Sequence, residues 1–266
     1  MAAIPLNETG IRDVKRALTS RFPKDKSSHL SEALAAALGF KTSISLAAAL
    51  RESDPDDPEH RLLNEAAFIA RLAAVSGRKM GVSDRWLIFD NLRYADGNSV
   101  IRTRSPGYKQ TKYTRATRLR SWRNMLVAGI NVAIDRRLFT IRPGDNRWPG
   151  HEPDRYGRYN PYLFEFEVEG IPAIASVNDA GYDELSIHVA FWPSPDSKKW
   201  VAAAWAGFLA GDAYASGWLE RRDGAWLQVS MQGLQDQFSC RRHRLAQVAQ
   251  LEVEPKGYAD RGSFKL

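Results

Sequence analysis

The residues best suited to chemistry are basic side chains gathered in one stretch, from Gly97 to Ile134. This stretch has eight Arg or Lys residues and no Asp or Glu, and the other 30 basic residues of the chain are matched by its 31 acidic ones. The eight are Arg102, Arg104, Lys109, Lys112, Arg115, Arg118, Arg120 and Arg123. Tyr108, Tyr113 and Trp122 lie among them. Concentrated positive charge attracts polyanions, basic groups hold phosphates, and aromatic rings stack on exposed bases. We call this stretch the basic window; it predicts a nucleic-acid-binding surface.

The chain also contains a segment of opposite charge. From Tyr159 to Ser197 there is no Lys or Arg but there are seven acidic residues. This acidic segment could lie against the basic window, so that the two neutralise each other inside the protein. An anionic small ligand or a lipid surface is a third interpretation. The salt dependence of binding separates these interpretations. Neutralising phosphates releases counterions, so the affinity for nucleic acid falls steeply as the salt concentration rises.

Within the acidic segment, Glu165, Glu167 and Glu169 alternate with apolar residues, which predicts that they share one face of a strand. Such a row could bind a basic protein partner, as an inhibitor does. It could also contribute to a divalent metal site with Asp179 or Asp183, since hard cations take oxygen ligands. The segment has no nearby Lys, so a metal-dependent nuclease is the less favoured alternative.

Other catalytic groups are sparse. His151, Glu152 and Asp154 lie together in a loop, but their spacing matches no helical metal-ligand pair. Cys240 precedes the basic run RRHR, and neighbouring cations can lower a thiol pKa, yet a lone cysteine in a helix is usually a small buried residue. The chain has no nucleophile elbow and no phosphate-cradling glycine loop. We therefore expect no catalytic residue, no bound metal and no cofactor.

Composition narrows the class of protein. A chain of 266 residues that is 44% hydrophobic can bury one good core or two smaller ones. No apolar run approaches the roughly 20 residues that span a bilayer, and the first residues do not form a secretory signal. The single cysteine excludes an internal disulfide. We expect a cytoplasmic protein that does not enter a membrane; its oligomeric state stays open.

Three short helices are predicted in residues 1–52. The first covers Ile11–Ser20, Ser27 or Ser28 begins the second, and Thr42 or Ser43 caps a third that continues through Leu50. Gly39 stands where a left-handed residue would end the second helix. Helix, glycine turn and helix form the outline of a helix-turn-helix. However, the apolar position expected early in a recognition helix falls on Ser45, so a small bundle that docks on a protein fits equally well.

The segment KSSHLSEALAAALGFKTSISLAAAL resembles a short helical module found beside glyoxalase-related and toxin–antitoxin-like bacterial domains. It is also similar to the N-terminus of uncharacterised proteins encoded on proteobacterial plasmids and integrative elements. The resemblance covers about a tenth of the chain. It implies a protein of a bacterial mobile element and identifies no catalytic residue.

An acidic, proline-containing loop at Ser53–His60 precedes the expected body, residues 61–266, which the Pro/Gly/Arg-rich loop at 142–161 could split. The predicted helices are Arg61–Ser76, Thr114–Phe139, Lys198–Trp218 and Gln232–Leu251. The predicted strands are Arg85–Leu92 and Ser99–Thr103, which form a hairpin, and Tyr162–Val168, Ala173–Asn178, Glu184–Trp192 and Ala225–Ser230. We expect an α+β fold, in which a mostly antiparallel sheet packs against the Thr114 and Lys198 helices.

These patterns together favour a non-enzymatic, DNA-binding protein of a bacterial mobile element that regulates transcription or maintains the element. The basic window would hold phosphates, and the N-terminal helices would read bases or contact a protein partner. The alternative is a protein-interaction factor or inhibitor that presents the acidic row.

Overall fold

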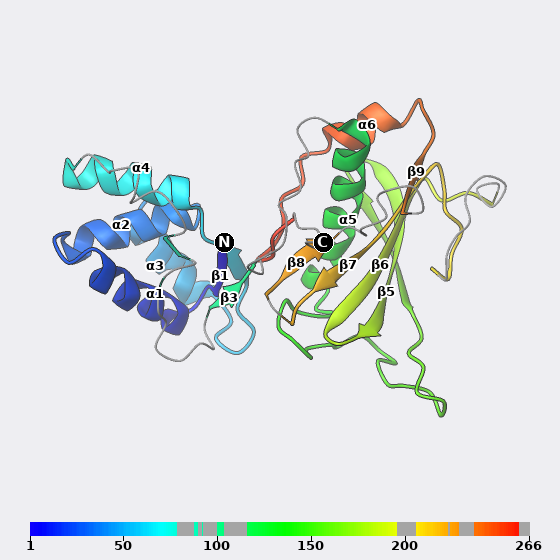
Figure 1. Ribbon diagram of the computed structural model, residues 1–266, viewed down its shortest axis with the longest axis horizontal. Coiled ribbons are helices and arrows are strands. Elements are labelled where there is room, and N and C mark those ends of the chain that lie inside the picture. Colours follow the sequence, from blue (N-terminus) through cyan, green and yellow to red (C-terminus); the bar gives the residue numbers. More distant parts are fainter. Residues whose placement is uncertain are drawn as a thin grey trace, which may run out of the picture. The chain divides into compact units, whose positions relative to one another are not determined.

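The structure is a computed structural model that describes residues 1–78, 88–89, 92, 100–103, 116–195, 206–222, 224–228 and 237–260. The chain divides into two compact units (Figure 1). Unit 1 comprises Met1–Arg104 and Lys256–Tyr258, and unit 2 comprises Ser105–Pro255 and Ala259–Leu266. The sequence suggested a boundary at residues 53–60. The division between the two compact units lies near Arg104, because the chain after this loop adds two strands and a helix to unit 1.

Unit 1 combines a small sheet with helices. The strands are β1 (Ala2–Pro5), β2 (His60–Leu62) and β3 (Ile101–Arg102), in the order β2-β1-β3 with antiparallel pairing. The helices are α1 (Glu8–Arg21), α2 (Ser27–Ala37), α3 (Ser43–Glu52) and α4 (Glu65–Ser76). The first three confirm the predicted N-terminal helices. Of the expected hairpin at 85–103, β3 is described and most of the rest lies outside the described residues.

Local side-chain chemistry accounts for two of these helix ends. Thr42 and Ser45 form a reciprocal capping box at the start of α3, which satisfies two amide groups that the helix leaves without partners. Gly39 has φ 85°, and the amide of Phe40 donates to the carbonyl of Ala35 at 2.9 Å. This is the hydrogen-bonding pattern of a helix that ends on a left-handed residue, which glycine adopts without a steric penalty.

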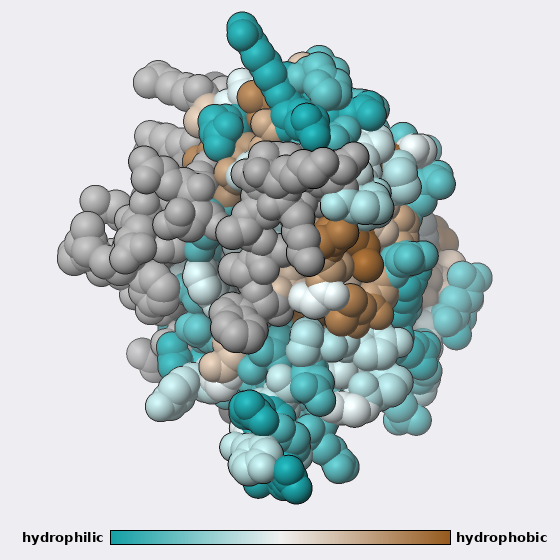
Figure 2. Space-filling model, turned by 90° about the vertical axis from the view of Figure 1, so that its right-hand side faces the viewer, coloured by the Kyte–Doolittle hydropathy of each residue, from teal (hydrophilic) through white to brown (hydrophobic). Residues whose placement is uncertain are grey.

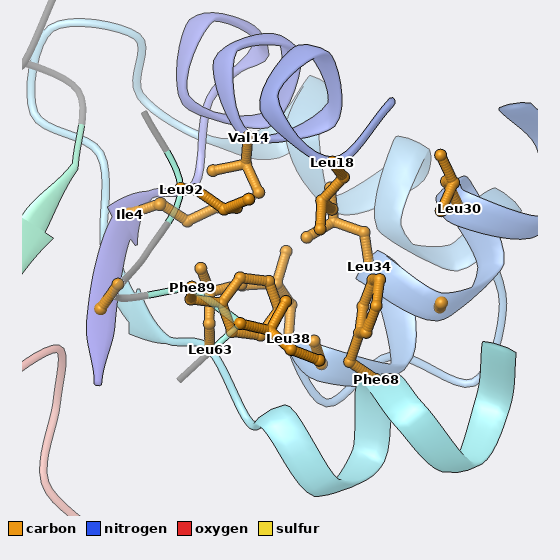
Figure 3. Close-up of a cluster of buried hydrophobic side chains, with 14 of the residues drawn as sticks. Ile4, Val14, Leu18, Leu30, Leu34, Leu38, Leu63, Phe68, Phe89 and Leu92 are labelled. Carbon is orange, nitrogen blue, oxygen red and sulfur yellow. The ribbon is translucent and has the colours of Figure 1, made fainter. Parts of the chain in front are cut away.

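The core of unit 1 lies between α1, α2, α4 and the sheet (Figure 3). Leu18, Leu34 and Phe68 meet at its centre, and the ring of Phe68 packs edge-on against that of Phe89, with 5.4 Å between the centroids. Helix α3 contributes little to this core. Ile44 on α3 is 80% exposed, so much of that helix faces solvent.

Unit 2 is built on a six-stranded antiparallel sheet in the order β4-β5-β6-β7-β8, with β9 also paired to β7. The strands are β4 (Tyr162–Val168), β5 (Ile171–Gly181), β6 (Glu184–Phe191), β7 (Ala213–Glu220), β8 (Trp226–Gln228) and β9 (Phe238–Cys240). Helix α5 (Thr117–Asp135) lies across one face of the sheet, and α6 (Leu245–Gln250) packs beside it (Figure 1). The fold is α+β, as the sequence predicted.

The contact between α5 and the sheet requires small residues and one buried indole. Gly129 of α5 and Gly217 of β7 leave room where the helix and the sheet approach closely. Trp122 of α5 is fully buried, and its Nε1 donates to the carbonyl oxygen of Ser216 at 2.7 Å. Ten consecutive residues of α5, 121–130, are buried, so both sides of this helix are covered within unit 2.

Two predicted helices were wrong. Residues 213–218 of the expected Lys198–Trp218 helix belong to β7, and residues 198–205 lie outside the described chain. The part of the expected helix that became β7 contains Tyr214 and Trp218, whose side chains are suited to strands. Ala203 and Ala204 of the expected apolar stripe lie outside the described residues. Of the expected Gln232–Leu251 helix, the described part begins with β9 and becomes helical only at α6.

The face of the molecule in Figure 2 is mainly hydrophilic, with one region where hydrophobic residues reach the surface. Leu163 of β4, which is 39% exposed, is one of the few large apolar side chains exposed among the described residues. Among these residues, no helix is both long enough and apolar enough to cross a bilayer.

Replacing Gly217 with Ala should lower the free energy of unfolding by about 1–3 kcal/mol, because the sheet cannot accept added volume there. The new Cβ would lie 2.7 Å from Leu126 Cδ1 and 3.0 Å from Trp122 Cζ2. Urea unfolding of Gly217→Ala, Leu126→Ala and the double variant measures this. Leu126→Ala should cost less stability in the Gly217→Ala background than alone. Equal costs in both backgrounds would show that the two residues do not compete for this space.

Candidate functional site

The basic window is divided between the two units. Arg102 is exposed on β3 in unit 1, whereas Arg118, Arg120 and Arg123 are on α5 in unit 2. The other predicted nucleic-acid-binding residues lie outside the described residues: Arg104, Lys109, Lys112, Arg115, Tyr108 and Tyr113. The window is therefore not one surface of one unit.

Arg123 lies inside unit 2. It is only 8% exposed, and both its Nε and Nη2 are 2.8 Å from Oδ2 of Asp260. Its Nη1 also donates to the side chain of Asn124 and to the carbonyl of Val253. The guanidinium thus holds residues 253–260 against α5. Arg123 is therefore not available to bind phosphate. The fully buried Trp122 is likewise a core residue and not a ring that could stack on bases.

Arg118 and Arg120 are exposed near the N-terminus of α5, and a second basic run lies beside them. Nη2 of Arg118 donates to the carbonyl of Phe238 in β9 at 3.1 Å. Oγ of Ser121, one turn further along α5, donates to the carbonyl of Leu245 at the start of α6 at 3.2 Å. The run Arg241–Arg244 connects these two contact points. We call Arg118, Arg120, Arg241, Arg242 and Arg244 the arginine cluster.

The charges of the arginine cluster are incompletely neutralised within the described chain. Asp212 forms ion pairs with two arginines of the cluster, Arg241 at 2.8 Å and Arg244 at 3.2 Å. Arg244 also lies over the ring of Trp192, 4.1 Å from the centroid. Arg120 and Arg242 are exposed and form no ion pair with another described residue. The cluster thus combines unmatched positive charge with an aromatic ring.

The N-terminus of α5 adds to this positive potential. Ala116 at the cap position makes no side-chain hydrogen bond to the helix, and the first turn has no acidic residue. The first amide groups of a helix have no intrahelical partner and carry a partial positive charge. The exposed arginines and these amides therefore favour an anion at the same end of α5.

Cys240 lies within the arginine cluster but is not activated. Burial raises the pKa of its thiol to about 11, and the nearby positive charges of Arg118 and Arg244 only partly oppose this effect. The thiol is protonated at neutral pH, so the structure does not support a covalent role for it.

The acidic row is shorter than predicted. Glu165 and Glu167 are exposed on β4, whereas Glu169 follows the strand in a turn with φ 48° and accepts a hydrogen bond from the amide of Glu252. β4 is an edge strand, and charged side chains on an edge discourage pairing with other chains. No ion pair joins the described residues of the acidic segment to those of the basic window. The described residues therefore give no sign that the two segments neutralise each other.

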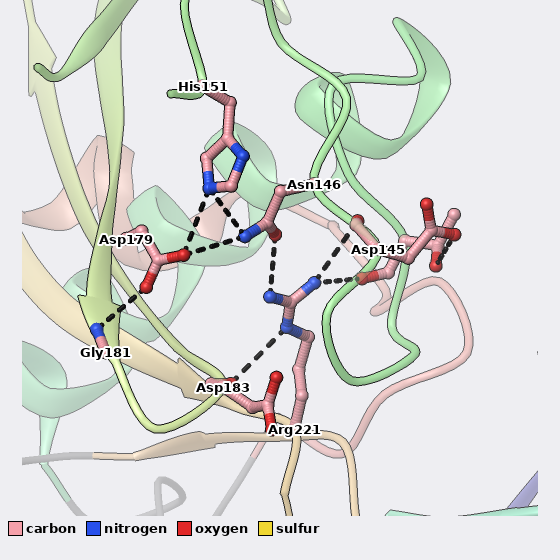
Figure 4. A network of polar contacts seen from close by, with 8 residues as sticks. Asp145, Asn146, His151, Asp179, Gly181, Asp183 and Arg221 are labelled. Atoms are coloured by element: carbon pink, nitrogen blue, oxygen red, sulfur yellow. Dashed lines mark hydrogen bonds and ion pairs between the residues drawn. The ribbon is translucent and has the colours of Figure 1, made fainter. Parts of the chain in front are cut away.

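His151 belongs to a polar network that connects the loop at 142–161 with the end of the sheet (Figure 4). Its Nε2 is 3.0 Å from Oδ2 of Asp179, and its ring stacks on that of Tyr159. Oδ1 of Asp179 accepts from the amide of Gly181 at 2.8 Å. Glu152 lines a pocket with His151, whereas Asp154 caps a turn of the loop and pairs with Arg158. The two acidic neighbours of His151 thus do not join it in a ligand set.

Arg221, which directly follows β7, stabilises this network through hydrogen bonds (Figure 4). The side chain is 1% exposed, and it donates to the carbonyl of Thr140 at 2.9 Å and to Oδ1 of Asn146 at 2.7 Å. Because arginine can only donate, this contact turns the amide nitrogen of Asn146 toward Asp179, 2.9 Å away. Arg221 and Asn146 were not among the residues predicted from the sequence, since nothing in their local pattern signals a contact between residues 75 positions apart.

The described residues contain no group of three or more His, Cys, Asp or Glu side chains that could hold a metal ion. Asp179 is oriented by His151, Asn146 and Gly181, and Glu169 lies in a turn, so the carboxylates proposed for a nuclease site do not converge. This part of the chain gives the metal-dependent nuclease alternative no support.

No protein-family model matches this chain, and neither does any curated protein or solved structure. Its function therefore has to be inferred from its own residues.

Replacing Arg221 with Met should lower the free energy of unfolding by about 2–4 kcal/mol, because the change leaves buried carbonyl oxygens without donors. Arg142→Met, which removes the same charge at an exposed position of the same loop, should change it by less than about 0.5 kcal/mol. Chemical denaturation of both variants is the measurement. Similar stability of the two variants would show that the Arg221 contacts are not needed to hold the loop.

Proposed function

We propose that this protein binds nucleic acid, with DNA as the expected partner, and that the arginine cluster of unit 2 is its phosphate-contacting surface. The observation that carries the proposal is the convergence of two basic stretches about 120 residues apart, shown by the contact between Arg118 and Phe238. The proposed activity is binding without catalysis. The role in a mobile element, in transcription regulation or maintenance, rests on the resemblance of the N-terminal segment.

The electrostatics of the arginine cluster support an anionic partner. Its arginines repel one another, and within the described chain Asp212 supplies ion pairs to only two of them. A phosphate group relieves this repulsion and takes the donors that the guanidinium groups and the N-terminus of α5 present. Arginine suits this role because its planar fork matches phosphate oxygens.

The N-terminal helices support a different task from phosphate binding. The solvent-facing side of α3 has Ile44, Ala47 and Ala48, which are apolar or small. Such a surface suits contact with a protein better than contact with a phosphate backbone. We therefore propose that unit 2 supplies nucleic-acid affinity, and that residues 1–52 contact a protein partner.

Removing charge from the arginine cluster should weaken binding to all sequences and reduce its salt dependence. We expect the variant Arg118→Gln/Arg120→Gln/Arg242→Gln to lower the slope of log affinity against log salt by about 2–3, since each phosphate contact contributes about 0.7 on single strands and 0.9 on duplex DNA. Fluorescence anisotropy with labelled duplex and single-stranded DNA, at low and physiological salt, measures both quantities.

The matched control is Arg12→Gln/Arg16→Gln/Arg51→Gln, which removes the same charge from exposed positions of unit 1. This control should leave the slope almost unchanged. Equal losses in both variants would mean that overall charge, and not the arginine cluster, determines binding. If the wild-type protein does not bind DNA even at low salt, the proposal fails, and the exposed Glu165 and Glu167 become the surface to test against a basic protein.

A further inference from the structure

The loop at 142–161 has a tip, residues 154–158, that presents one aromatic ring between arginines of the sequence. Tyr156 is 64% exposed, and Cζ of Arg155 and Cζ of Arg158 lie 4.7 Å and 5.1 Å from the centroid of its ring. In Figure 1 this loop (green) projects below the sheet, at the end of unit 2 opposite α6. The arginine cluster lies next to β9 and α6, so the loop tip is a separate surface.

The loop tip is held in one conformation by Asp154. Oδ1 of Asp154 accepts hydrogen bonds from the amides of Tyr156, at 2.8 Å, and Arg158, at 2.9 Å. The amide of Gly157, which has φ 74°, donates to the carbonyl of Asp154 at 2.8 Å. Glycine adopts this left-handed conformation without a steric penalty. A turn that is already ordered loses less conformational entropy when it binds a partner.

The rest of the loop is attached to the interior of unit 2. The ring of His151 packs edge-on against that of Trp148, with 4.4 Å between the centroids, and stacks on that of Tyr159 at 5.2 Å. Trp148 is buried, and Asp179 of β5 lies 3.0 Å from Nε2 of His151 (Figure 4). These contacts mean that the loop tip projects from an anchored segment of the chain.

The two arginines of the loop tip differ in how they are held. Arg158 pairs with Asp154, with 3.3 Å between Nη2 and Oδ2. Arg155 is exposed and forms no ion pair with another described residue. Because its only aromatic contact is with an exposed ring, Arg155 can leave that ring and bind a phosphate, for which its planar fork is well suited. That movement gives a second planar group access to Tyr156.

Tyr182 shows that exposure alone does not produce such a surface. It lies in the turn between β5 and β6 and is 84% exposed. Its neighbour in the sequence is Asp183, and Asp179 is near the end of β5. Carboxylates repel phosphate, so an exposed ring in this turn does not favour a nucleic acid. The ring of Tyr156 has arginines as neighbours instead.

We propose that the loop tip binds single-stranded nucleic acid, with Tyr156 stacked on an unpaired base and Arg155 on a phosphate. Every base has a π-face, so this contact requires no particular sequence. A duplex keeps its base faces inside the stack, and an acidic protein has no base for the ring. The proposal rests on nucleic-acid binding by unit 2 and adds to it a preference for unpaired strands.

Fluorescence anisotropy with three labelled DNA probes of equal length tests this proposal: oligothymidine, an abasic strand and a duplex. Tyr156→Ala should weaken binding to oligothymidine about tenfold, because it removes one base-stacking contact. Its affinity for the abasic strand and the duplex should hardly change, since neither offers an unpaired base. Tyr156→Trp should bind oligothymidine at least as tightly as the wild type. Arg155→Gln should lower the salt slope on oligothymidine by about 0.7.

The matched control is Tyr182→Ala, which removes the other exposed ring and should bind all three probes like the wild type. Thermal unfolding of Tyr156→Ala should match that of the wild type, since the ring is exposed. Equal losses of Tyr156→Ala on oligothymidine and the abasic strand would show that the loop tip recognises negative charge alone, and would overturn the proposal.

The same measurements separate this proposal from the proposed function on which it rests. If the wild-type protein binds none of the probes, nucleic-acid binding itself fails. If it binds oligothymidine and only the arginine-cluster variant loses affinity, the proposed function stands and the role of the loop tip is refuted.

Discussion

The structure of unit 2 depends on the point where β7 changes its hydrogen-bonding partner. β7 pairs with β9 through Ala215 and with β8 from Trp218 onward. Between these pairings, the amide of Ser216 donates to Gln237, and its carbonyl oxygen accepts the indole N–H of Trp122. A buried carbonyl without a donor is costly, so the side chain of α5 completes the sheet where no strand does. The absence of a side chain at Gly217 allows that approach.

The contact between Trp122 and Ser216 determines where the exposed arginines of α5 lie. Once the middle of α5 is buried, its first turn lies against β9, where Arg118 contacts Phe238, and the C-terminal segment packs along the helix. The amide of Asn124 donates to the carbonyls of Val248 and Leu251, and Arg123 binds Asp260. These bonds bring the stretch between β9 and α6, with its basic run, against the N-terminal end of α5. The arginine cluster is thus a consequence of how the core is assembled.

Sequence patterns predicted the structural features that depend only on residues close together in the chain. Strand β4 was predicted to the residue because its side chains alternate, and Gly39 ends its helix through its own backbone conformation. Strand β1 was missed because a short, fully buried strand shows no alternation. On a helical wheel Arg123 falls near the apolar face of α5 and Arg120 flanks it, but both belong to one basic run and both were predicted to bind phosphate. Their different roles depend on Asp260, 137 residues from Arg123, and contacts at that distance leave no trace in spacing.

Unit 2 contains two charge imbalances of opposite sign, and burial determines what each responds to. The arginine cluster is largely exposed, so mobile ions screen it, and ionic strength controls its attraction for phosphates. Glu220 of β7 is buried, and burial, together with its hydrogen bond to Glu184, raises the pKa of Glu220 to about 7. The charge of Glu220 therefore responds to pH near neutrality. Because the two charges respond to different variables, varying salt at fixed pH addresses the arginine cluster, and varying pH at fixed salt addresses Glu220.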